Sequence, residues 1–244
     1  MQAILFSAGY GTRLKPLTDH KPKALVEVAG KPVLQHNIEK LVRAGCQRIV
    51  VNVHHFPGQI RDFLKSRHHF GIEMLISDET DEILDTGGGL LKAASLFKPD
   101  ETIIAHNVDV LSDLDLNLVL ERHTLRNDLA TLVVRDRVTQ RYLLFDEKMK
   151  LQGWMNQSTG EKIIPPGESG SAFTPLAFSG IQVISPELLS LIPQRGRFSI
   201  IETYLSLVQA GRIYGFQDRS EVWIDIGKPE QLMEAERLFA AKRD

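Results

Sequence analysis

Two glycines and two cations stand close together near the start of the chain, in a pattern that could bind phosphate. Gly9 and Gly11 lie in the run Ala-Gly-Tyr-Gly-Thr at 8–12, and Arg13 and Lys23 follow. Glycine lacks a Cβ, so the backbone can turn sharply and approach a ligand closely. Successive backbone N–H groups in such a turn form a concavity for phosphate oxygens, and Arg and Lys add positive charge. The alternative is an ordinary strand-to-turn connection with solvated basic side chains.

Two familiar phosphate loops do not fit this segment. The dinucleotide-binding fingerprint needs a third glycine for close packing of helix on strand, and Leu14 stands at that place. The P-loop of kinases and ATPases ends in Gly-Lys followed by Ser or Thr, and the sequence contains no such triplet. The loop must therefore belong to a third kind of nucleotide site.

Two aspartates interrupt apolar runs at the ends of predicted strands. Asp109 follows the strand predicted at 102–105, and Asp225 lies in a Trp-Ile-Asp-Ile-Gly segment near the other end of the chain. The carboxyl edge of an open α/β sheet is where ligands bind. A shared Mg²⁺ would offset the cost of burying both charges; a helix cap or a salt-bridged strand end is the alternative for each. Asp113 and Asp115 are interpreted as caps of the helix that follows them.

Strand-like and helix-like segments alternate through the first half of the chain. Strands are predicted at 3–6, 48–53, 73–77, 102–105 and 129–134, and helices at 32–44, 58–67, 88–96 and 115–126. This alternation predicts an α/β fold with a mostly parallel sheet and helices on both faces.

The pattern changes after residue 135. A hairpin is predicted from 142–145 and 151–155, and the polar stretch 156–171 is predicted to be a long mobile loop near a site. Further strands at 176–184, 213–216 and 222–226 and helices at 198–209 and 229–241 complete the chain. We expect one domain over 1–244, made of a core at 1–135, a substrate-side elaboration at 136–226 and a C-terminal helix at 227–244.

Composition excludes several classes of protein. The chain has 244 residues, of which 43% are hydrophobic and 25% charged, which is ordinary for a globular domain. A net charge of -2 gives no electrostatic footprint for nucleic acid. No apolar run approaches the roughly 20 residues that span a bilayer, and the start lacks the features of a signal peptide. The single cysteine, Cys46, suits a reducing cytoplasm and is interpreted as a packed structural thiol.

Positions 8–18, with Pro22 and Lys23, resemble the signature loop of the sugar-1-phosphate nucleotidyltransferases, Ala-Gly-x-Gly-Thr-Arg-Leu-x-Pro-Leu-Thr followed by Pro-Lys. The resemblance implies a Rossmann-like (GT-A-like) fold and a reaction that joins a sugar 1-phosphate to a nucleoside triphosphate with loss of pyrophosphate. It makes Arg13 and Lys23 catalytic. It also implies that the nucleotide is bound by Ala8, Gly9, Gly11, Thr12, Arg13 and Lys23.

Other stretches extend the resemblance to about residue 235. Asn107-Val-Asp109 is similar to the family's Asn-Gly-Asp, with valine in place of glycine, and 223–227 matches its Trp-x-Asp-x-Gly. The resemblance implies that Asp109 and Asp225 hold Mg²⁺ and that residues 136–226 are the sugar side. It further implies a glycine-rich turn that contacts base and ribose, and close sugar contacts; a generic helix N-terminus before 90–92 is the competing view of that turn. The residues concerned are Glu79, Thr86, Gly87 and Gly88 for the nucleotide, and Asn107 and Gly180 for the sugar.

One departure bears on the substrate. Larger family members carry Glu-Lys-Pro where this chain has Ser-Ala-Phe-Thr-Pro at 171–175. That departure, the short chain and the triple glycine at 87–89 are most similar to the N-acetylmuramate-1-phosphate uridylyltransferases of peptidoglycan recycling. A guanylyl-, cytidylyl- or thymidylyltransferase acting on another sugar phosphate remains open, as does a non-catalytic nucleotide- or sugar-binding regulatory module. The sequence leaves base, sugar and oligomeric state undecided.

Several basic and aromatic residues have no assigned chemistry. The histidine pairs at 54–55 and 68–69 lack the spacing of a zinc site and are interpreted as surface or loop residues. His106 neighbours Asn107 and is expected near the site, with its role open. Arg195 and Arg197 are interpreted as a solvated basic turn rather than a phosphate grip.

Overall fold

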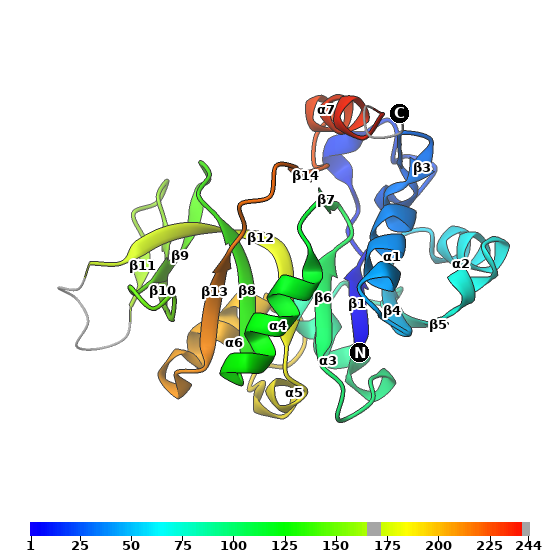
Figure 1. The fold of residues 1–244 in the computed structure, drawn as a ribbon. Coiled ribbons are helices and arrows are strands. Elements are labelled where there is room, and N and C mark those ends of the chain that lie inside the picture. The colour runs from blue at the N-terminus through cyan, green and yellow to red at the C-terminus, as the bar shows by residue number, and fades with distance from the viewer. Residues whose placement is uncertain (165–171, 241–244) are drawn as a thin grey trace.

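The computed structural model describes residues 1–164 and 172–240. Within these residues ten strands form one sheet, in the order β11-β10-β9-β12-β6-β1-β4-β5, with β8 and β13 joined on beside β12. Helices cover both faces of this sheet (Figure 1). The mixed α/β architecture predicted from the alternation of segments is therefore confirmed.

The parallel half of the sheet brings the loops that follow its strands to one edge. β1 (Gln2–Phe6) lies between β4 (Arg48–Val53) and β6 (Ile103–Asn107), and β5 (Glu73–Asp78) pairs with β4 at the edge. All three pairings are parallel, and Phe6 at the end of β1 lies opposite Asn52 and Asn107. The segments that follow β1, β4 and β6 therefore emerge side by side at one edge.

The antiparallel half begins at one long strand. β12 (Thr174–Ile184) pairs antiparallel with β6, β8 (Ala130–Arg135) and β9 (Arg141–Phe145), and its register with β8 shifts between Phe178 and Gln182. β10 (Leu151–Asn156) and β11 (Lys162–Ile163) continue the antiparallel pairing beyond β9, whereas β13 (Ile213–Gln217) pairs parallel with β8. Strands from before and after residue 135 thus share one sheet.

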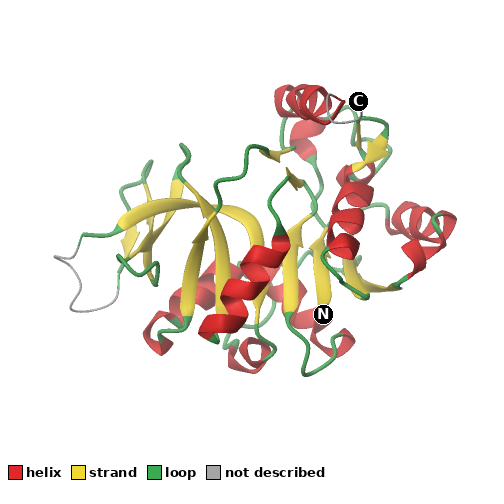
Figure 2. Ribbon diagram, viewed as in Figure 1, coloured by secondary structure: helices red, strands yellow, loops and turns green. Residues whose placement is uncertain are grey.

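Helices lie on both faces because each carries one apolar stripe (Figure 2). One buried cluster joins the sheet to α1 (Val33–Arg43), α2 (Pro57–Ser66) and α4 (Leu116–Arg126). The opposite cluster contains α3 (Asp85–Lys92), α5 (Glu187–Leu191) and α6 (Ile200–Ser206). The C-terminal helix α7 (Pro229–Ala240) turns Leu232, Ala235 and Phe239 into a third cluster, as predicted from their spacing.

β7 (Val110–Ser112), β2 (Glu27–Val28) and β3 (Lys31–Pro32) were not predicted, because they are too short to show a period. β2 pairs with β3, and β7 pairs antiparallel with β14 (Trp223–Asp225), which lies within the strand predicted at 222–226. The loop predicted over 156–171 is partly wrong, because Trp154 pairs with Ile163 in a short β10–β11 ladder. The rest of that prediction, at 165–171, lies outside the described residues.

The glycine-rich segment at 86–88 forms the first turn of α3, which begins at Asp85, so the alternative of a helix N-terminus is the correct one. A Cβ on Gly87 would lie 2.3 Å from the Phe198 ring, and one on Gly88 would lie 2.3 Å from the carbonyl oxygen of Gly196. The N–H groups of Gly87 and Gly88 both donate to the Phe198 carbonyl. These glycines therefore let α3 approach the segment that leads into α6.

Substitution at this contact tests its importance for stability. We expect Gly88→Ala to lower the free energy of unfolding by about 1–3 kcal/mol, because a backbone carbonyl blocks the added methyl group. Gly58→Ala is the control, since a Cβ there meets nothing within 4 Å. Urea unfolding of both variants measures the difference, and equal stabilities would contradict this explanation.

Candidate functional site

A cleft opens at the carboxyl ends of the parallel strands, where two cavities adjoin. The phosphate-loop cavity, about 320 Å³, and the α3 cavity, about 210 Å³, share the residues Phe6, Gly9 and Asp109. The phosphate-loop cavity is further lined by Ser7, Tyr10, Gly11, Thr12, Arg13, Lys23, Val108 and Gly227. The α3 cavity is further lined by Ala8, Asn52, Glu79, Ile83, Asp85, Thr86 and Asn107. Most predicted site residues therefore meet at one place.

The loop after β1 keeps its shape through a glycine. Gly11 has φ +66°, and a Cβ there would lie 3.0 Å from the Cβ of Lys23 and from Thr18. The Gly11 carbonyl accepts hydrogen bonds from the Thr18 hydroxyl at 2.9 Å and from the Leu14 N–H at 2.9 Å. The loop thus folds directly over Lys23, which only glycine permits at this position.

Opposite charges meet beneath this loop. Lys23 Nζ lies 2.5 Å from Asp109 Oδ2, and the Lys23 side chain is only 11% exposed. The backbone N–H of Ile226, next to Asp225, donates to the Asp109 carbonyl at 2.8 Å. Burial, and then the Asp109 carboxylate, raise the pKa of Asp225; Lys23 and Arg13 oppose the rise. The structure therefore brings Asp109 and Asp225 together from distant parts of the chain.

Asp225 carries an unused acceptor. Its Oδ1 is buried and has no hydrogen-bond partner among the described residues. A Cβ on Gly227 would lie 3.1 Å from this oxygen and 2.8 Å from Arg13 Nη2, so glycine lets the guanidinium lie beside the strand end. Two carboxylates with a free oxygen fit Mg²⁺, which proteins hold with one or two carboxylates plus substrate phosphates. No cluster of three or more His, Cys, Asp or Glu suited to a metal occurs in the described part of the chain.

Glu79 lies in the α3 cavity with its carboxylate directed into the protein. Its side chain is fully buried; Oε1 accepts from Asn52 Nδ2 at 2.8 Å and Oε2 from the Leu84 N–H at 3.0 Å. Asn52 Oδ1 in turn accepts from the Ser7 N–H at 2.6 Å. Glu79 thereby ties the loop after β1 to the start of α3. Asn52, which the sequence did not single out, is the link.

Some of the remaining predicted contact residues line the site and others do not. Gly180 has φ +77°, and a Cβ there would lie 2.9 Å from Asn107 Nδ2, so the two predicted sugar residues are neighbours. Thr86 lines the α3 cavity, whereas neither Gly87 nor Gly88 is among its lining residues. His106 is a fully buried residue of β6; burial, and then Lys40, lower its pKa to about 3.

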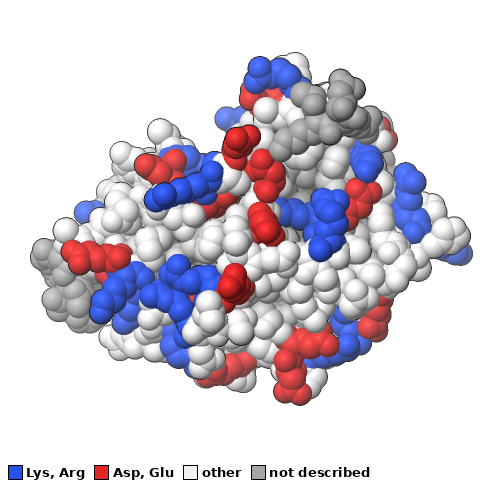
Figure 3. Space-filling model, in the orientation of Figure 1, with Lys and Arg blue, Asp and Glu red and all other residues white. Residues whose placement is uncertain are grey.

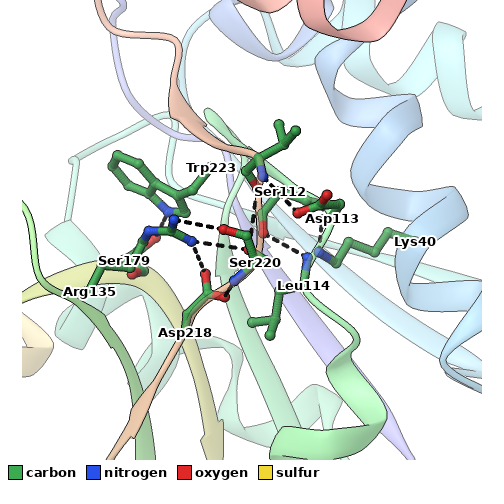
Figure 4. Close-up of polar contacts among 10 residues, drawn as sticks. Lys40, Ser112, Asp113, Leu114, Arg135, Ser179, Asp218, Ser220 and Trp223 are labelled. Atoms are coloured by element: carbon green, nitrogen blue, oxygen red, sulfur yellow. Dashed lines mark hydrogen bonds and ion pairs between the residues drawn. The ribbon is translucent and has the colours of Figure 1, made fainter. Parts of the chain in front are cut away.

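A polar network holds β14, and with it Asp225, in place (Figure 4). Trp223 Nε1 donates to the Ser179 carbonyl at 3.0 Å. The Val222 N–H donates to Asp113 Oδ1 at 2.9 Å, so the prediction that Asp113 caps the next helix is wrong; Asp115 does cap it. Arg135 and Asp218 form a 2.7 Å ion pair at the base of the same segment. This long-range network has no local sequence signal.

Tyr10, in the glycine loop, packs on a residue that follows β4. Its hydroxyl lies 3.1 Å from His54 Nε2, and its ring meets the His54 ring edge-on at 5.2 Å. His54 Nδ1 donates to the Glu79 carbonyl at 2.6 Å. His54 therefore supports the loop, which agrees with its interpretation as a loop residue. Arg195 donates to the carbonyls of Ile192 and Gln194, as a turn residue does.

A third cavity, the aromatic cavity, measures about 430 Å³ and includes Phe178 in its lining. Its lining is mostly apolar, with two arginines and two glutamates among thirteen residues. Those residues are Arg137, Thr139, Arg141, Tyr142, Leu143, Trp154, Glu161, Ile163, Phe178, Ser199, Ile201, Glu202 and Leu205. Glu161 and Ile163 of this set belong to the stretch 156–171 that was predicted from the sequence to lie near a site.

Surface charge, helix composition and the cysteine bear on the functions considered from the sequence. Basic and acidic side chains are interspersed over the face seen in Figure 3, with no continuous basic surface there. The described helices include none with the length and apolarity that crossing a bilayer requires. Cys46 is buried, and burial raises the pKa of its thiol to about 12, so it is a packed thiol.

Comparison with known proteins decides the family. The family model described as nucleotidyl transferase matches residues 2–152. The chain belongs to this family. It is 29% identical to the N-acetylmuramate alpha-1-phosphate uridylyltransferase of Caulobacter vibrioides, over 98% of this chain and 96% of that protein. It is 32% identical to the mannose-1-phosphate guanyltransferase of Pichia angusta, over 98% of this chain, but it spans only 64% of that longer protein.

The fold agrees with this family. A crystal structure of a putative glucose-1-phosphate thymidylyltransferase from Bacillus anthracis superposes with a TM-score of 0.83, at 19% identity, over 98% of this chain and 95% of that one. The Rossmann-like nucleotidyltransferase fold predicted from the signature loop is thus confirmed. Sugar-1-phosphate nucleotidyl transfer is the activity that these relatives support.

The raised pKa of Asp225 predicts a dependence of stability on pH. Because the folded-state pKa lies above the unfolded value of about 3.9, ionised Asp225 destabilises the fold above that pH and not below it. Asp225→Asn should therefore raise the free energy of unfolding at pH 7, with the gain fading toward about pH 4. Urea unfolding across this range measures it. Asp115→Asn, at an exposed cap where Asn serves as well as Asp, is the control; a loss of stability in Asp225→Asn at pH 7 would contradict the assignment.

Proposed function

We propose that this protein transfers a nucleotidyl group to a sugar 1-phosphate and releases pyrophosphate, most specifically from UTP to N-acetylmuramate 1-phosphate. The observation that carries the reaction is the meeting of Arg13, Lys23, Asp109 and Asp225 at the loop formed by Gly9 and Gly11. Cations suit a polyphosphate, and paired carboxylates suit a divalent ion that accompanies it.

The chain's own groups would act by positioning and by charge. The attacking phosphate oxygen is already anionic, so a general base is unnecessary, and rate enhancement comes from alignment and stabilisation of developing charge. Arg13 and the loop N–H groups would hold the β- and γ-phosphates. Lys23, now paired with Asp109 at 2.5 Å, would move its ammonium toward the α-phosphate when substrate enters. Asn107, beside Gly180, would contact the sugar.

Mg²⁺ is the cofactor that these residues fit. Asp109 and Asp225 would hold it, and the buried free Oδ1 of Asp225 supports this role. When bound, the ion neutralises phosphate charge on both substrates and so reduces their repulsion. Burial, and then the neighbouring Asp109 carboxylate, raise the pKa of Asp225, and a bound cation would favour the ionised form of both carboxylates.

The choice of substrates rests on the relatives. The uridylyltransferase of Caulobacter vibrioides matches this chain over nearly the full length of both proteins, which supports UTP and N-acetylmuramate 1-phosphate as the substrates. A cytoplasmic role in peptidoglycan recycling is proposed as the consequence of that substrate pair. The guanyltransferase of Pichia angusta is slightly more identical but longer, which keeps GTP with mannose 1-phosphate as the second candidate. A regulatory module that binds without turnover would need fewer of the four charged residues than are present.

A substrate matrix tests the proposal. The purified protein with MgCl₂ is mixed with each of UTP, GTP, CTP, dTTP and ATP against N-acetylmuramate, mannose and glucose 1-phosphates, and pyrophosphate release is measured. Turnover should be highest for UTP with N-acetylmuramate 1-phosphate. A preference for GTP with mannose 1-phosphate would favour the second candidate. Absence of pyrophosphate in every combination would leave a binding module.

Two substitutions test the residues. Lys23→Ala and Asp109→Ala should each lower kcat/KM by about 10²–10³-fold, the usual cost of losing one electrostatic contact at the reacting group. Lys15→Ala is the matched control, because Lys15 belongs to the same loop and forms an exposed pair with Asp19 at 3.2 Å. Circular dichroism confirms folding. Near-normal turnover in either site variant would refute the role given to that residue.

A further inference from the structure

Arg137 connects the carboxylate site to the aromatic cavity. It lies in the loop between β8 and β9, and its guanidinium carbon stands 4.4 Å from the centroid of the Trp223 ring. Its Nη2 donates to the Phe178 carbonyl at 3.1 Å. Trp223 holds the Arg137 group from one side and Phe178 fixes one edge of it, so the guanidinium has a defined orientation.

The stacked ring places Arg137 on the same side of β14 as Asp225. Residues i and i+2 of a strand face the same way, and Trp223 and Asp225 have that spacing in β14. Burial lowers the pKa of Arg137, and the nearby Asp225 carboxylate opposes that shift. Arg137 in turn opposes the rise in the pKa of Asp225 that burial causes. Asp225 therefore has Arg13 beside it next to Gly227 and a second arginine beside Trp223.

The guanidinium has a donor to spare. Arg137 Nε is buried and has no hydrogen-bond partner among the described residues. An unpaired buried donor on a charged group is costly, so such a group is expected to find an acceptor in the functional complex. The fork of N–H groups on arginine matches phosphate oxygens. The group thus has the chemistry of a phosphate contact.

The surroundings of Arg137 fit the rest of a phosphorylated sugar. It lines the aromatic cavity, about 430 Å³, together with Tyr142, Trp154 and Phe178. Cavities of roughly 300–1,000 Å³ lined by apolar and aromatic groups with few polar ones are typical of small-molecule sites. A sugar in this cavity would have its 1-phosphate near Arg137, on the side that leads to Asp225.

We propose that Arg137 binds the phosphate of the acceptor sugar 1-phosphate, with the sugar in the aromatic cavity, while Arg13 and Lys23 serve the triphosphate. This assignment rests on the proposed function. It gives each of the two anionic substrates its own cation on opposite sides of Asp225. The two phosphates can then approach each other without competing for one positive group.

Kinetics separate this role from a structural one. Arg137→Gln keeps a side chain of similar reach but removes the charge, and it should raise KM for the sugar 1-phosphate about tenfold or more, the expected size for a lost charge-assisted hydrogen bond. KM for the nucleoside triphosphate should stay within about twofold, because the phosphate-loop cavity is untouched. Arg137→Lys, which keeps the charge, should fall between. Equal increases in both KM values would overturn the proposal.

The chain offers a matched control. Arg126 also stacks at 4.4 Å from an aromatic centroid, that of Tyr214, and also donates to a backbone carbonyl, that of Lys148. Arg126→Gln removes the same kinds of contact away from the three cavities and should leave both KM values unchanged. A similar rise in KM for the sugar 1-phosphate in this variant would show that loss of any stacked arginine has this effect, and would contradict the assignment.

Binding tests Arg137 even if no substrate pair turns over. The two tryptophans of the chain are Trp154, which lines the aromatic cavity, and Trp223, which lies against Arg137. Their fluorescence is followed while mannose 1-phosphate or inorganic phosphate is added to the wild-type protein and to Arg137→Gln. Weaker binding of both probes in the variant supports the proposal. Equal binding to both proteins, or none to the wild type, overturns it, whereas failure of the substrate matrix alone would refute only the proposed reaction.

Discussion

The ion pair between Lys23 and Asp109 is the interaction on which the architecture of the cleft depends. It closes at 2.5 Å beneath the loop of Gly11 and joins the segment after β1 to the end of β6. Asp225 stands beside this pair; burial, and then the Asp109 carboxylate, raise its pKa, while Lys23, Arg13 and Arg137 oppose the rise. The fold thus gathers carboxylates and cations in the cleft where a polyphosphate with its divalent ion would bind.

Keeping Asp225 in that position requires a long-range scaffold. β14 is too short to be stable alone; it pairs with β7 and is held by Trp223, Asp113 and the Arg135–Asp218 pair. The β7 strand directly follows the segment of Asp109, so both carboxylates move with one small ladder. The relative position of the Asp109 and Asp225 carboxylates is therefore set by a few backbone hydrogen bonds rather than by the large central sheet.

The sequence predicted the strands of the core and the convergence of Asp109 with Asp225, because buried parallel strands and their carboxyl edges leave strong local patterns. It failed where a residue's partner is remote. Gly87 and Gly88 look like a flexible turn in sequence, yet they are packed by Phe198 and Gly196 from more than a hundred residues away. The sequence did not identify Arg137 as a candidate site residue, because its role depends on contacts with Trp223 and Phe178, which only folding brings near.

The contact between α3 and α6 lies between two of the cavities. Thr86 lines the α3 cavity, and its hydroxyl accepts from the N–H of Ile200 at 3.1 Å, next to Ser199 of the aromatic cavity. This bond joins the walls of the two cavities, so a displacement of either helix on ligand binding would reach the other cavity. Thermodynamic reciprocity would then require that each ligand change the affinity of the other by the same factor. The contact between α3 and α6 would thus govern cooperativity between the two ligands.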